Sequence, residues 1–264
     1  MYNTVTTTLS PKKEIGVVIT ATNAYSVLGI NFMKRFTHYY SGDQNIKFYF
    51  YSDIDPIEYL PDNINFEYIH TENKIWEVGN NLRFDAVLSL KDSNSDYLYY
   101  FDADTNVNKD FTEEWFLGDL VGGQHFLDQT SMKVVKGYER NKKSIVYIPL
   151  DTKLPQMYYY GAFWGGLKEN VIKFCETVQK NRSIDKENGY SMPYNEKYIN
   201  HYFHYNPPTK SVLNKDFMFR ISTKCGIGNT RIIGLNINTI KSDLLKNKNN
   251  LTDISNGVVI VKNN

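Results

Sequence analysis

Residues 96–113, "DYLYYFDADTNVNKDFTE", are compatible with two kinds of site that exclude each other. Its opening run, residues 96–101, has no alternating polar face, which is typical of a strand that is buried on both sides. Two carboxylates, Asp102 and Asp104, follow that run directly. We therefore expect an acidic pair at the carboxyl end of a central strand, where α/β sheets bind their ligands.

A calcium loop is the first interpretation of these acidic residues. The ligand positions of an EF-hand would be filled by Asp102, Asp104, Asn106, Asn108, Asp110 and Glu113. The sixth position needs glycine for its sharp turn, but Val107 stands there, and Lys109 replaces the usual apolar residue at the eighth. The preceding run also has strand composition, whereas an EF-hand needs a helix. The sequence therefore favours a strand that is followed by a polar turn over residues 106–113.

Two interpretations of Asp102 and Asp104 stay open on these residues alone. Aspartates are common in solvated turns, which needs no ligand. Their spacing, however, places both side chains on one side of the strand's extension, where like charges repel unless a cation lies between them. Mn²⁺, or Mg²⁺, binds carboxylates and diphosphate oxygens together. Neither a glycine-rich dinucleotide motif nor a P-loop occurs in the sequence, so a metal would supply most of the phosphate binding.

Strands and helices alternate outward from this run. We expect strands at 14–20, 46–53, 64–70, 119–127 and 157–166, and helices at 26–40, 78–90, 168–180 and 194–205. The pattern predicts an α/β domain with a mostly parallel central sheet flanked by helices. We expect an N-terminal extension at 1–13, a catalytic domain at 14–240, and a polar, mobile tail at 241–264.

The composition excludes several classes of protein. Thirty basic and 29 acidic residues among 264 leave a net charge of +1, which gives no support for a nucleic-acid partner. Two cysteines are too few for a disulfide framework, and no apolar run is long enough for a membrane span. We expect a soluble, cytoplasmic protein. The 21 tyrosines and 15 phenylalanines suit sugar-stacking clefts, and they suit half-buried strands equally well.

Several spaced segments together resemble the retaining α-1,3-glycosyltransferases of family 6, the group of the blood-group A and B transferases and α-1,3-galactosyltransferase. The matching segments are "TATNAY", "WEVGNNLRF", "YYFDADTNV", "HFLDQTSMKVVKGYERNKKSIVYIP", "YYYGAFWGG" and "YNEKYINHYFHYNPPTK". The resemblance implies a GT-A fold, which is a single Rossmann-like nucleotide-sugar domain, together with a UDP-sugar donor, an oligosaccharide acceptor and Mn²⁺.

The resemblance also implies roles for individual residues. Asp102 and Asp104 would hold the metal and His125 would contact the acceptor, although a lone histidine after a strand is more often a hydrogen-bonded surface residue. The uridine and the rest of the donor would be bound by Thr20, Ala21, Tyr25, Arg83 and Asp102.

In "YYYGAFWGG", the resemblance places Tyr160, Gly161 and Ala162 beside the donor sugar. The methyl group of Ala162 takes space that an N-acetyl group would occupy, and such steric rejection discriminates strongly between sugars. We therefore expect galactose rather than N-acetylgalactosamine. Without the resemblance, this segment is an aromatic strand whose glycines allow another backbone to come close.

In "PYNEKYINHYF", Glu196 is the candidate catalytic residue, because the resemblance places it beneath the anomeric carbon. Such a carboxylate stabilises an oxocarbenium-like transition state, or attacks the anomeric carbon to give a covalent intermediate as the diphosphate leaves. The sequence leaves double displacement and a front-face mechanism both open. As a generic helix residue, Glu196 would simply complement the helix dipole. The family's usual "WHDE" is replaced by Pro193, Tyr194, Asn195 and Glu196. Asn195 keeps hydrogen bonds to the donor sugar without charge, and Tyr194 with Glu196 would face the acceptor.

The sequence thus predicts a Mn²⁺-dependent retaining glycosyltransferase that moves galactose from UDP-galactose to the 3-hydroxyl of a terminal β-galactoside. The alternatives are an α-1,3-transferase that uses UDP-N-acetylgalactosamine, or another retaining GT-A enzyme. A non-catalytic, calcium-dependent glycan-binding module is the alternative from another class.

Overall fold

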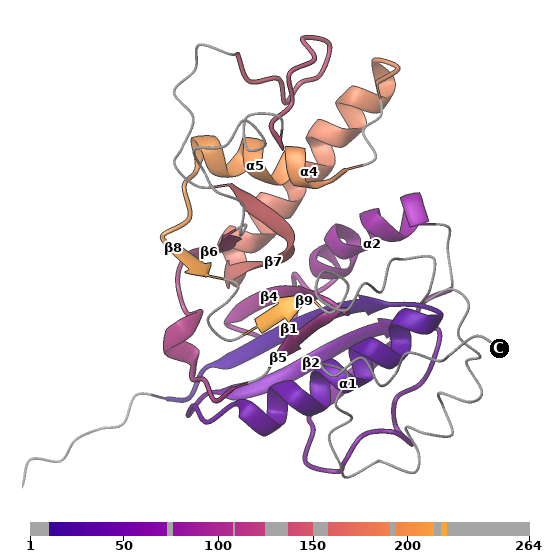
Figure 1. Ribbon diagram of the computed structural model, residues 1–264, viewed down its shortest axis with the longest axis vertical. Helices are drawn as coiled ribbons and strands as arrows, with labels where there is room; N and C mark the ends of the chain where they lie inside the picture. Colours follow the sequence, from indigo (N-terminus) through magenta and orange to yellow (C-terminus); the bar gives the residue numbers. More distant parts are fainter. Residues whose placement is uncertain are drawn as a thin grey trace, which may run out of the picture.

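A seven-stranded sheet forms the centre of this computed structural model, in the order β3-β2-β1-β4-β7-β6-β8 (Figure 1). The structure describes residues 11–72, 76–107, 109–124, 137–149, 158–190, 194–213 and 218–220. The strands of the sheet are β1 (Glu14–Ala21), β2 (Asn45–Ser52), β3 (Phe66–His70), β4 (Tyr97–Asp102), β6 (Leu120–Gln124), β7 (Tyr159–Leu167) and β8 (Lys210–Leu213).

Strand direction divides the sheet into two parts. Strands β3, β2, β1 and β4 are parallel to one another, and β6 is parallel to β8. Strand β7 lies between β4 and β6 and is antiparallel to both. Residues Ile15 to Ile19 of β1 are buried without a polar side, as expected for a parallel strand that is covered on both faces.

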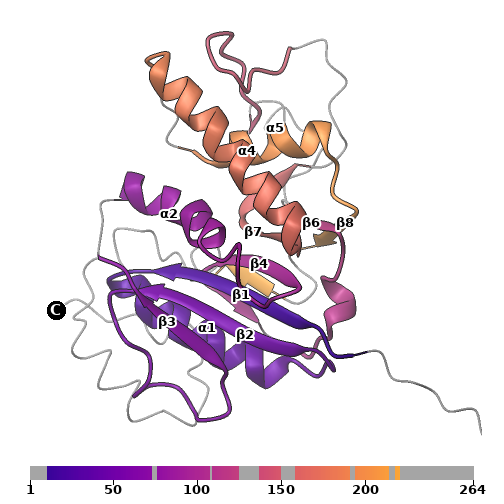
Figure 2. The same ribbon diagram turned by 180° about the vertical axis from the view of Figure 1, so that it is seen from behind.

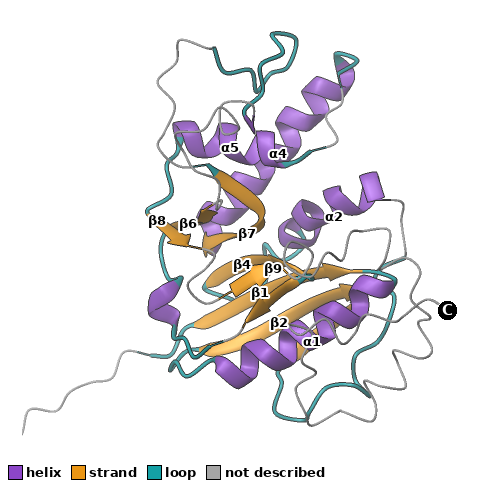
Figure 3. Cartoon of the chain, in the orientation of Figure 1, coloured by secondary structure: helices purple, strands orange, loops and turns teal. Residues whose placement is uncertain are grey.

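Helices cover the two faces of the sheet (Figures 1 and 2). Helix α1 (Ala24–Tyr39) packs on one face. Helices α2 (Trp76–Leu88) and α4 (Lys168–Glu187) pack on the other, and α5 (Glu196–Tyr205) lies against α4 and β7. The cartoon in Figure 3 shows the resulting layered α/β arrangement, which confirms the predicted fold class.

The helix that is predicted at 26–40 is confirmed, and its buried residues follow helical spacing. Val27, Ile30, Met33 and Phe36 are at most 3% exposed and belong to the hydrophobic cluster on the α1 face of the sheet. The predicted end of the last helix is also confirmed, since α5 ends at Tyr205, before Asn206 and the two prolines. Helix α4 continues to Glu187, beyond the predicted end at residue 180.

The predicted polar turn after the acidic pair is wrong for its first residues. Thr105–Val107 form a strand, β5, which pairs with β9 (Met218–Arg220) in antiparallel fashion. Val107 is fully buried, and its carbonyl accepts a hydrogen bond from Arg35 Nε at 2.7 Å. The pairing partner lies more than one hundred positions downstream, so local sequence patterns cannot indicate this strand. A short 3-10 helix, η1 (Glu113–Trp115), follows.

Strand β1 begins at Glu14, where the predicted catalytic domain begins. The predicted tail at 241–264 lies outside the described residues, so the domain limits stay predictions. None of the helices in the described part of the chain is both long and apolar enough to cross a membrane.

Candidate donor and catalytic site

The acidic pair lies at the carboxyl end of β4. Asp102 is the last residue of that strand, and Asp104 lies in the turn before β5 with a side chain that is buried at 1% exposure. Asp102 Oδ1 accepts a hydrogen bond from the Tyr100 hydroxyl at 2.9 Å and lies 3.4 Å from Arg83 Nη2. The carboxylate of Asp102 is therefore held between a phenol and a guanidinium group.

Tyr100 connects Asp102 to the first strand. Its hydroxyl is 3.0 Å from Thr20 Oγ1, and Thr20 lies opposite Asp102 in the β1–β4 register. Burial raises the pKa of Tyr100 despite the nearby Arg83, so the phenol stays protonated and can donate to the carboxylate. Sequence reasoning missed Tyr100. The two-residue period of a strand, which places residues 100 and 102 on one face, is a signal that could have found it.

Arg83 of α2 bridges β4 and β7. Its Nη1 donates to the carbonyl of Gly161 at 2.9 Å, while Nη2 faces Asp102. The guanidinium carbon also lies 5.1 Å from the centre of the Tyr100 ring. The side chain is only 11% exposed, so a carbonyl, a carboxylate and an aromatic face together fix its position.

Glu196 is the first residue of α5, and its side chain points to β7. Its Oε1 accepts a hydrogen bond from the backbone N–H of Gly161 at 2.9 Å. It also contacts the hydroxyl of Tyr158, where burial and the Glu196 charge raise the pKa of the tyrosine. The Asn200 side chain holds this end of the helix, because its Nδ2 donates to the carbonyls of Tyr159 at 2.6 Å and Glu196 at 2.8 Å. The carboxylate of Glu196 is thus placed by both the strand and its own helix.

Glycine at position 161 allows these groups to approach. A Cβ atom there would lie 3.1 Å from Arg83 Nη1 and 3.3 Å from Glu196 Cγ, which is tighter than ordinary packing. The strand is irregular at this point. The pairing of β6 with β7 moves from Gly122–Trp164 to Gln124–Tyr159, so two steps along β6 match five along β7. Such bulges occur beside functional sites and re-aim the side chains around them.

The remaining predicted donor residues lie at or next to the end of β1 and the start of β7. Tyr160 and Ala162 are buried in the bulged stretch and belong to the cluster on the α1 face, as does Ala21 at the end of β1. Tyr25 is half-buried against the same cluster. The structure therefore brings the predicted donor residues to one end of the sheet, where β1 and β4 end and β7 begins.

The loop between β1 and α1 has an unusual backbone. Asn23 adopts φ 58° and ψ −132°, a backbone conformation that residues other than glycine rarely adopt. Its N–H donates to both carboxylate oxygens of Asp53, at 3.0 and 2.9 Å, and the Ser26 hydroxyl donates to Asp53 Oδ1 at 2.7 Å. Sequence reasoning missed Asp53, which stabilises the strained loop from the end of β2.

The predicted acceptor residues are less fully described. Tyr194 is 62% exposed and lies just before α5, next to the buried Asn195. His125 follows β6 and lies outside the described residues, so its role stays a prediction.

Comparisons with known proteins give the class of this fold and site. The profile of "Glycosyltransferase family 6" matches residues 5–238. Over 166 residues the chain is 28% identical to the O-antigen biosynthesis glycosyltransferase WbnI of Escherichia coli, covering 61% of this chain and 70% of that protein. Over 214 residues it is 25% identical to the globoside alpha-1,3-N-acetylgalactosaminyltransferase 1 of Gallus gallus, covering 78% and 61% respectively.

A shorter match, 42% identical over 73 residues, links the chain to glycosyltransferase 6 domain-containing protein 1 of Mus musculus and covers 28% of this chain and 22% of that protein. The fold and the family match define a GT-A-like glycosyltransferase domain. The chain belongs to glycosyltransferase family 6.

Proposed function

We propose that this protein is a metal-dependent retaining transferase that moves galactose from UDP-galactose to the 3-hydroxyl of a terminal β-galactoside. The observation that carries the proposal is one continuous set of contacts. It runs from Thr20 through Tyr100 to Asp102, from Asp102 to Arg83, and through Gly161 to Glu196. The predicted diphosphate and catalytic residues therefore share one hydrogen-bonded network.

The residues at the end of β4 are proposed to hold a hard divalent cation. Asp102 and Asp104 supply two carboxylates, and Mn²⁺ or Mg²⁺ commonly binds through one or two carboxylates plus substrate phosphates. When bound there by Asp102 and Asp104, Mn²⁺ would stabilise negative charge on the diphosphate leaving group. Arg83 supplies a second positive charge beside Asp102, and its fork-shaped guanidinium suits phosphate oxygens.

Glu196 is proposed to act on the sugar. A carboxylate stabilises the positive charge of an oxocarbenium-like transition state, whether it attacks the anomeric carbon or remains unbonded. The N–H of Gly161 orients this carboxylate from the strand that also carries Ala162. Glu196 is thus proposed as the catalytic residue in both versions of the retaining mechanism.

Two residues that are proposed to lie beside the sugar support galactose as the donor. Ala162 is 1% exposed and Tyr160 is 3% exposed, so both positions are tightly packed in the bulged stretch of β7. An N-acetyl group needs space near the second carbon of the sugar, and buried bulk there rejects it. A donor with N-acetylgalactosamine is the second candidate, because the similar chicken protein is named an alpha-1,3-N-acetylgalactosaminyltransferase.

On the acceptor side, the proposal places Tyr194, Glu196 and His125 near the terminal β-galactoside. The exposed ring of Tyr194 offers an apolar face with a hydroxyl, which suits stacking on a sugar. The acceptor would approach from the amino-terminal end of α5.

Isothermal titration calorimetry with UDP, UDP-galactose and UDP-N-acetylgalactosamine, each with and without Mn²⁺, tests the proposal. We expect Mn²⁺ to strengthen UDP binding, Asp102→Ala or Asp104→Ala to abolish that gain, and UDP-galactose to bind best. Equal UDP affinity in both variants and the parent protein would refute the metal site. Calcium-dependent glycan binding without UDP affinity would instead support the binding-module alternative.

A further inference from the structure

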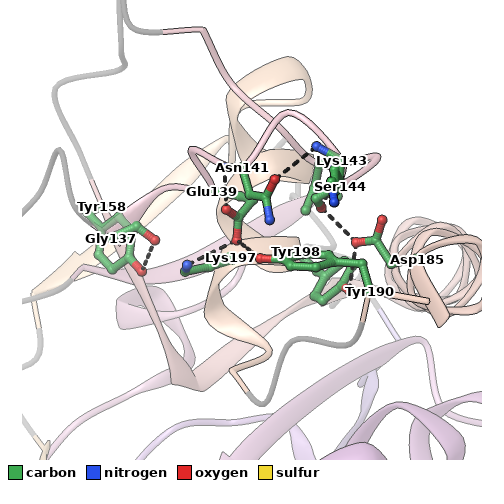
Figure 4. Close-up of polar contacts among 11 residues, drawn as sticks. Gly137, Glu139, Asn141, Lys143, Ser144, Tyr158, Asp185, Tyr190, Lys197 and Tyr198 are labelled. Carbon is green, nitrogen blue, oxygen red and sulfur yellow. Dashed lines mark hydrogen bonds and ion pairs between the residues drawn. The ribbon is translucent and has the colours of Figure 1, made fainter. Parts of the chain in front are cut away.

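Three successive residues of α5, beginning with the proposed catalytic carboxylate, each have a polar tie to the segment 137–149, either directly or through one other side chain. Figure 4 shows the ties of Lys197 and Tyr198, and the contact of Tyr158 with Gly137. The Tyr158 hydroxyl shares its single proton between the Glu196 carboxylate and the carbonyl of Gly137, which lies 3.2 Å away. Lys197 Nζ donates to Glu139 Oε2 at 3.0 Å. Tyr198 is tied to the segment through a residue of α4.

The tie at Tyr198 passes through Asp185, which is fully buried. The Tyr198 hydroxyl donates to Asp185 Oδ2 at 2.9 Å. The same carboxylate accepts the Ser144 hydroxyl at 2.7 Å and the N–H of Ile145 at 2.7 Å. Asp185 therefore joins α4, α5 and the segment 137–149 in one buried network.

The tie at Lys197 joins a partly exposed ammonium group to a buried carboxylate. Glu139 is 3% exposed, and besides Lys197 it accepts the Tyr190 hydroxyl at 3.0 Å and the N–H of Asn141 at 2.6 Å. Burial acts to raise the pKa of Glu139, but these hydrogen bonds and the Lys197 charge outweigh it and hold the pKa below its usual value. Glu139 is thus an ionised, buried carboxylate whose counter-charge comes from α5.

Helix geometry explains why the three ties matter together. Successive residues of an α-helix point about 100° apart, so anchors on Glu196, Lys197 and Tyr198 hold the helix on three different sides. Rotation of the first turn about its axis, or a slide along it, would break at least one tie. Any such movement would also carry the Glu196 carboxylate away from the Gly161 N–H.

We propose that Glu139, acting through Lys197, is a positioning residue that fixes the carboxylate of Glu196 for catalysis. This inference rests on the proposed function, since it assumes that Glu196 acts on the sugar. Glu139 itself does not touch substrate. It binds the neighbouring residue of the same helical turn and makes the segment 137–149 a rigid support for the catalytic residue.

The test compares Glu139→Gln with Tyr190→Phe, a matched control. Tyr190→Phe removes one hydrogen bond to the Glu139 carboxylate and leaves its contact with Lys197 of α5 in place. Glu139→Gln removes the negative charge that Lys197 contacts. We expect Glu139→Gln to lower kcat roughly ten- to a hundredfold, because small misplacements of catalytic groups have effects of that size. The KM for the donor, and the UDP affinity by calorimetry, should stay within about twofold in both variants.

A double-mutant cycle with Glu196→Gln tests whether Glu139 acts through Glu196. In the Glu196→Gln background, Glu139→Gln should cause little further loss of kcat. All rates are measured below the unfolding transition of each variant, and Lys197→Gln replaces Glu139→Gln if the latter does not fold.

Three results would overturn the positioning role: normal kcat in Glu139→Gln, an equal loss in Tyr190→Phe, or an undiminished loss in the Glu196→Gln background. Each of these leaves the proposed function intact provided that Glu196→Gln alone lowers kcat by orders of magnitude to a residual rate that can still be measured. Near-normal turnover of Glu196→Gln is the distinct result that removes the catalytic assignment and the positioning role with it.

Discussion

Gly161 joins Arg83 to Glu196 through its own backbone. Its carbonyl accepts from Arg83 Nη1 and its N–H donates to Glu196 Oε1, both at 2.9 Å. One residue without a side chain therefore sets the separation between the group that faces Asp102 and the proposed catalytic carboxylate. The first prediction follows from this arrangement.

Gly161→Ala should reduce turnover by about tenfold or more. The new methyl group would meet Arg83 Nη1 at 3.1 Å and Glu196 Cγ at 3.3 Å, so at least one of them must move. Overpacking of this kind also lowers the free energy of unfolding by about 1–3 kcal/mol. Steady-state kinetics and urea unfolding measure the two effects.

Gly189→Ala is the control for that variant. Position 189 has φ +70° and open space around it, so alanine there strains the backbone without touching the site. It should lower stability and leave kcat unchanged. A normal kcat in Gly161→Ala would show that the spacing of Arg83 and Glu196 is not critical.

Tyr100→Phe should weaken the binding of UDP with Mn²⁺. The change removes the hydroxyl that donates to Asp102 and contacts Thr20, and a hydrogen bond to a charged group contributes about 1.5–3 kcal/mol. Calorimetry measures the loss of affinity. Tyr49→Phe is the matched control, because its hydroxyl bonds Ser95 at 3.2 Å, before the start of β4 and away from the acidic pair at the end of that strand. Equal affinities in the two variants would contradict a role for Tyr100 in the site.

Asp53→Asn should raise the KM for the donor more than it lowers kcat. Asp53 holds the N–H of Asn23 in a strained backbone conformation, and the loop leads to the predicted uridine residue Tyr25. The strained conformation of Asn23 costs about 1–3 kcal/mol. Without the negative charge of Asp53 this conformation is no longer held, and the loop between β1 and α1 moves. Asn23→Gly is the companion variant, because glycine adopts positive φ readily, and it should preserve the KM while stability stays equal or rises. An unchanged KM in Asp53→Asn would show that this loop does not bind the donor.

The stability of the fold should fall as the pH drops from about 6.5 to about 4, because of His201. Burial, followed by the charge of His204, lowers the pKa of His201 from 6.5 to about 4, although Asp185 acts in the opposite direction. In this window the unfolded chain binds a proton that the folded protein does not, so the free energy of unfolding falls by up to about 1.4 kcal/mol per pH unit.

Urea unfolding of the parent protein and His201→Gln at several pH values checks this prediction. The variant should lose most of the slope between pH 6.5 and 4.5. The carboxylates Glu113 and Glu139, whose pKa values are lowered, contribute at lower pH: their stabilisation is present above their ordinary pKa of 4.5 and is lost as they become protonated below it. Parallel pH profiles for the parent protein and the variant would rule out His201 as the source.

Local patterns predicted the parts of this fold that depend on local rules. The apolar run at 97–101 and the helical spacing of Val27, Ile30 and Met33 both reflect burial in the core. The strand β4 and the helix α1 accordingly lie where they were expected. Strand β8 was not predicted, because Lys210–Leu213 is short and its neighbour β6 lies far away in the sequence. Strand pairing over long distances leaves little trace in a single short segment.

The residues of the candidate site also fall into two groups: those that motifs indicate and those that only the folded chain brings to the site. Arg83, Asp102 and Glu196 were expected from motifs, and the structure links them through Gly161 and Tyr100. The supporting residues Asp53 and Glu139 were not predicted. Each is a single acidic residue in a polar stretch, and only the folded chain shows which backbone N–H or ammonium group it meets.

The pairing of β5 with β9 also has a consequence for the order in which the protein assembles during synthesis. Thr105, the residue after Asp104, lies opposite Arg220, so its strand partner leaves the ribosome more than one hundred residues later. Helical contacts within α1 can form early, whereas closure of such a long loop comes late. A nascent chain that has reached Asp104 therefore carries its acidic pair without the neighbouring strand, and we expect the site to be completed only after β9 has been made.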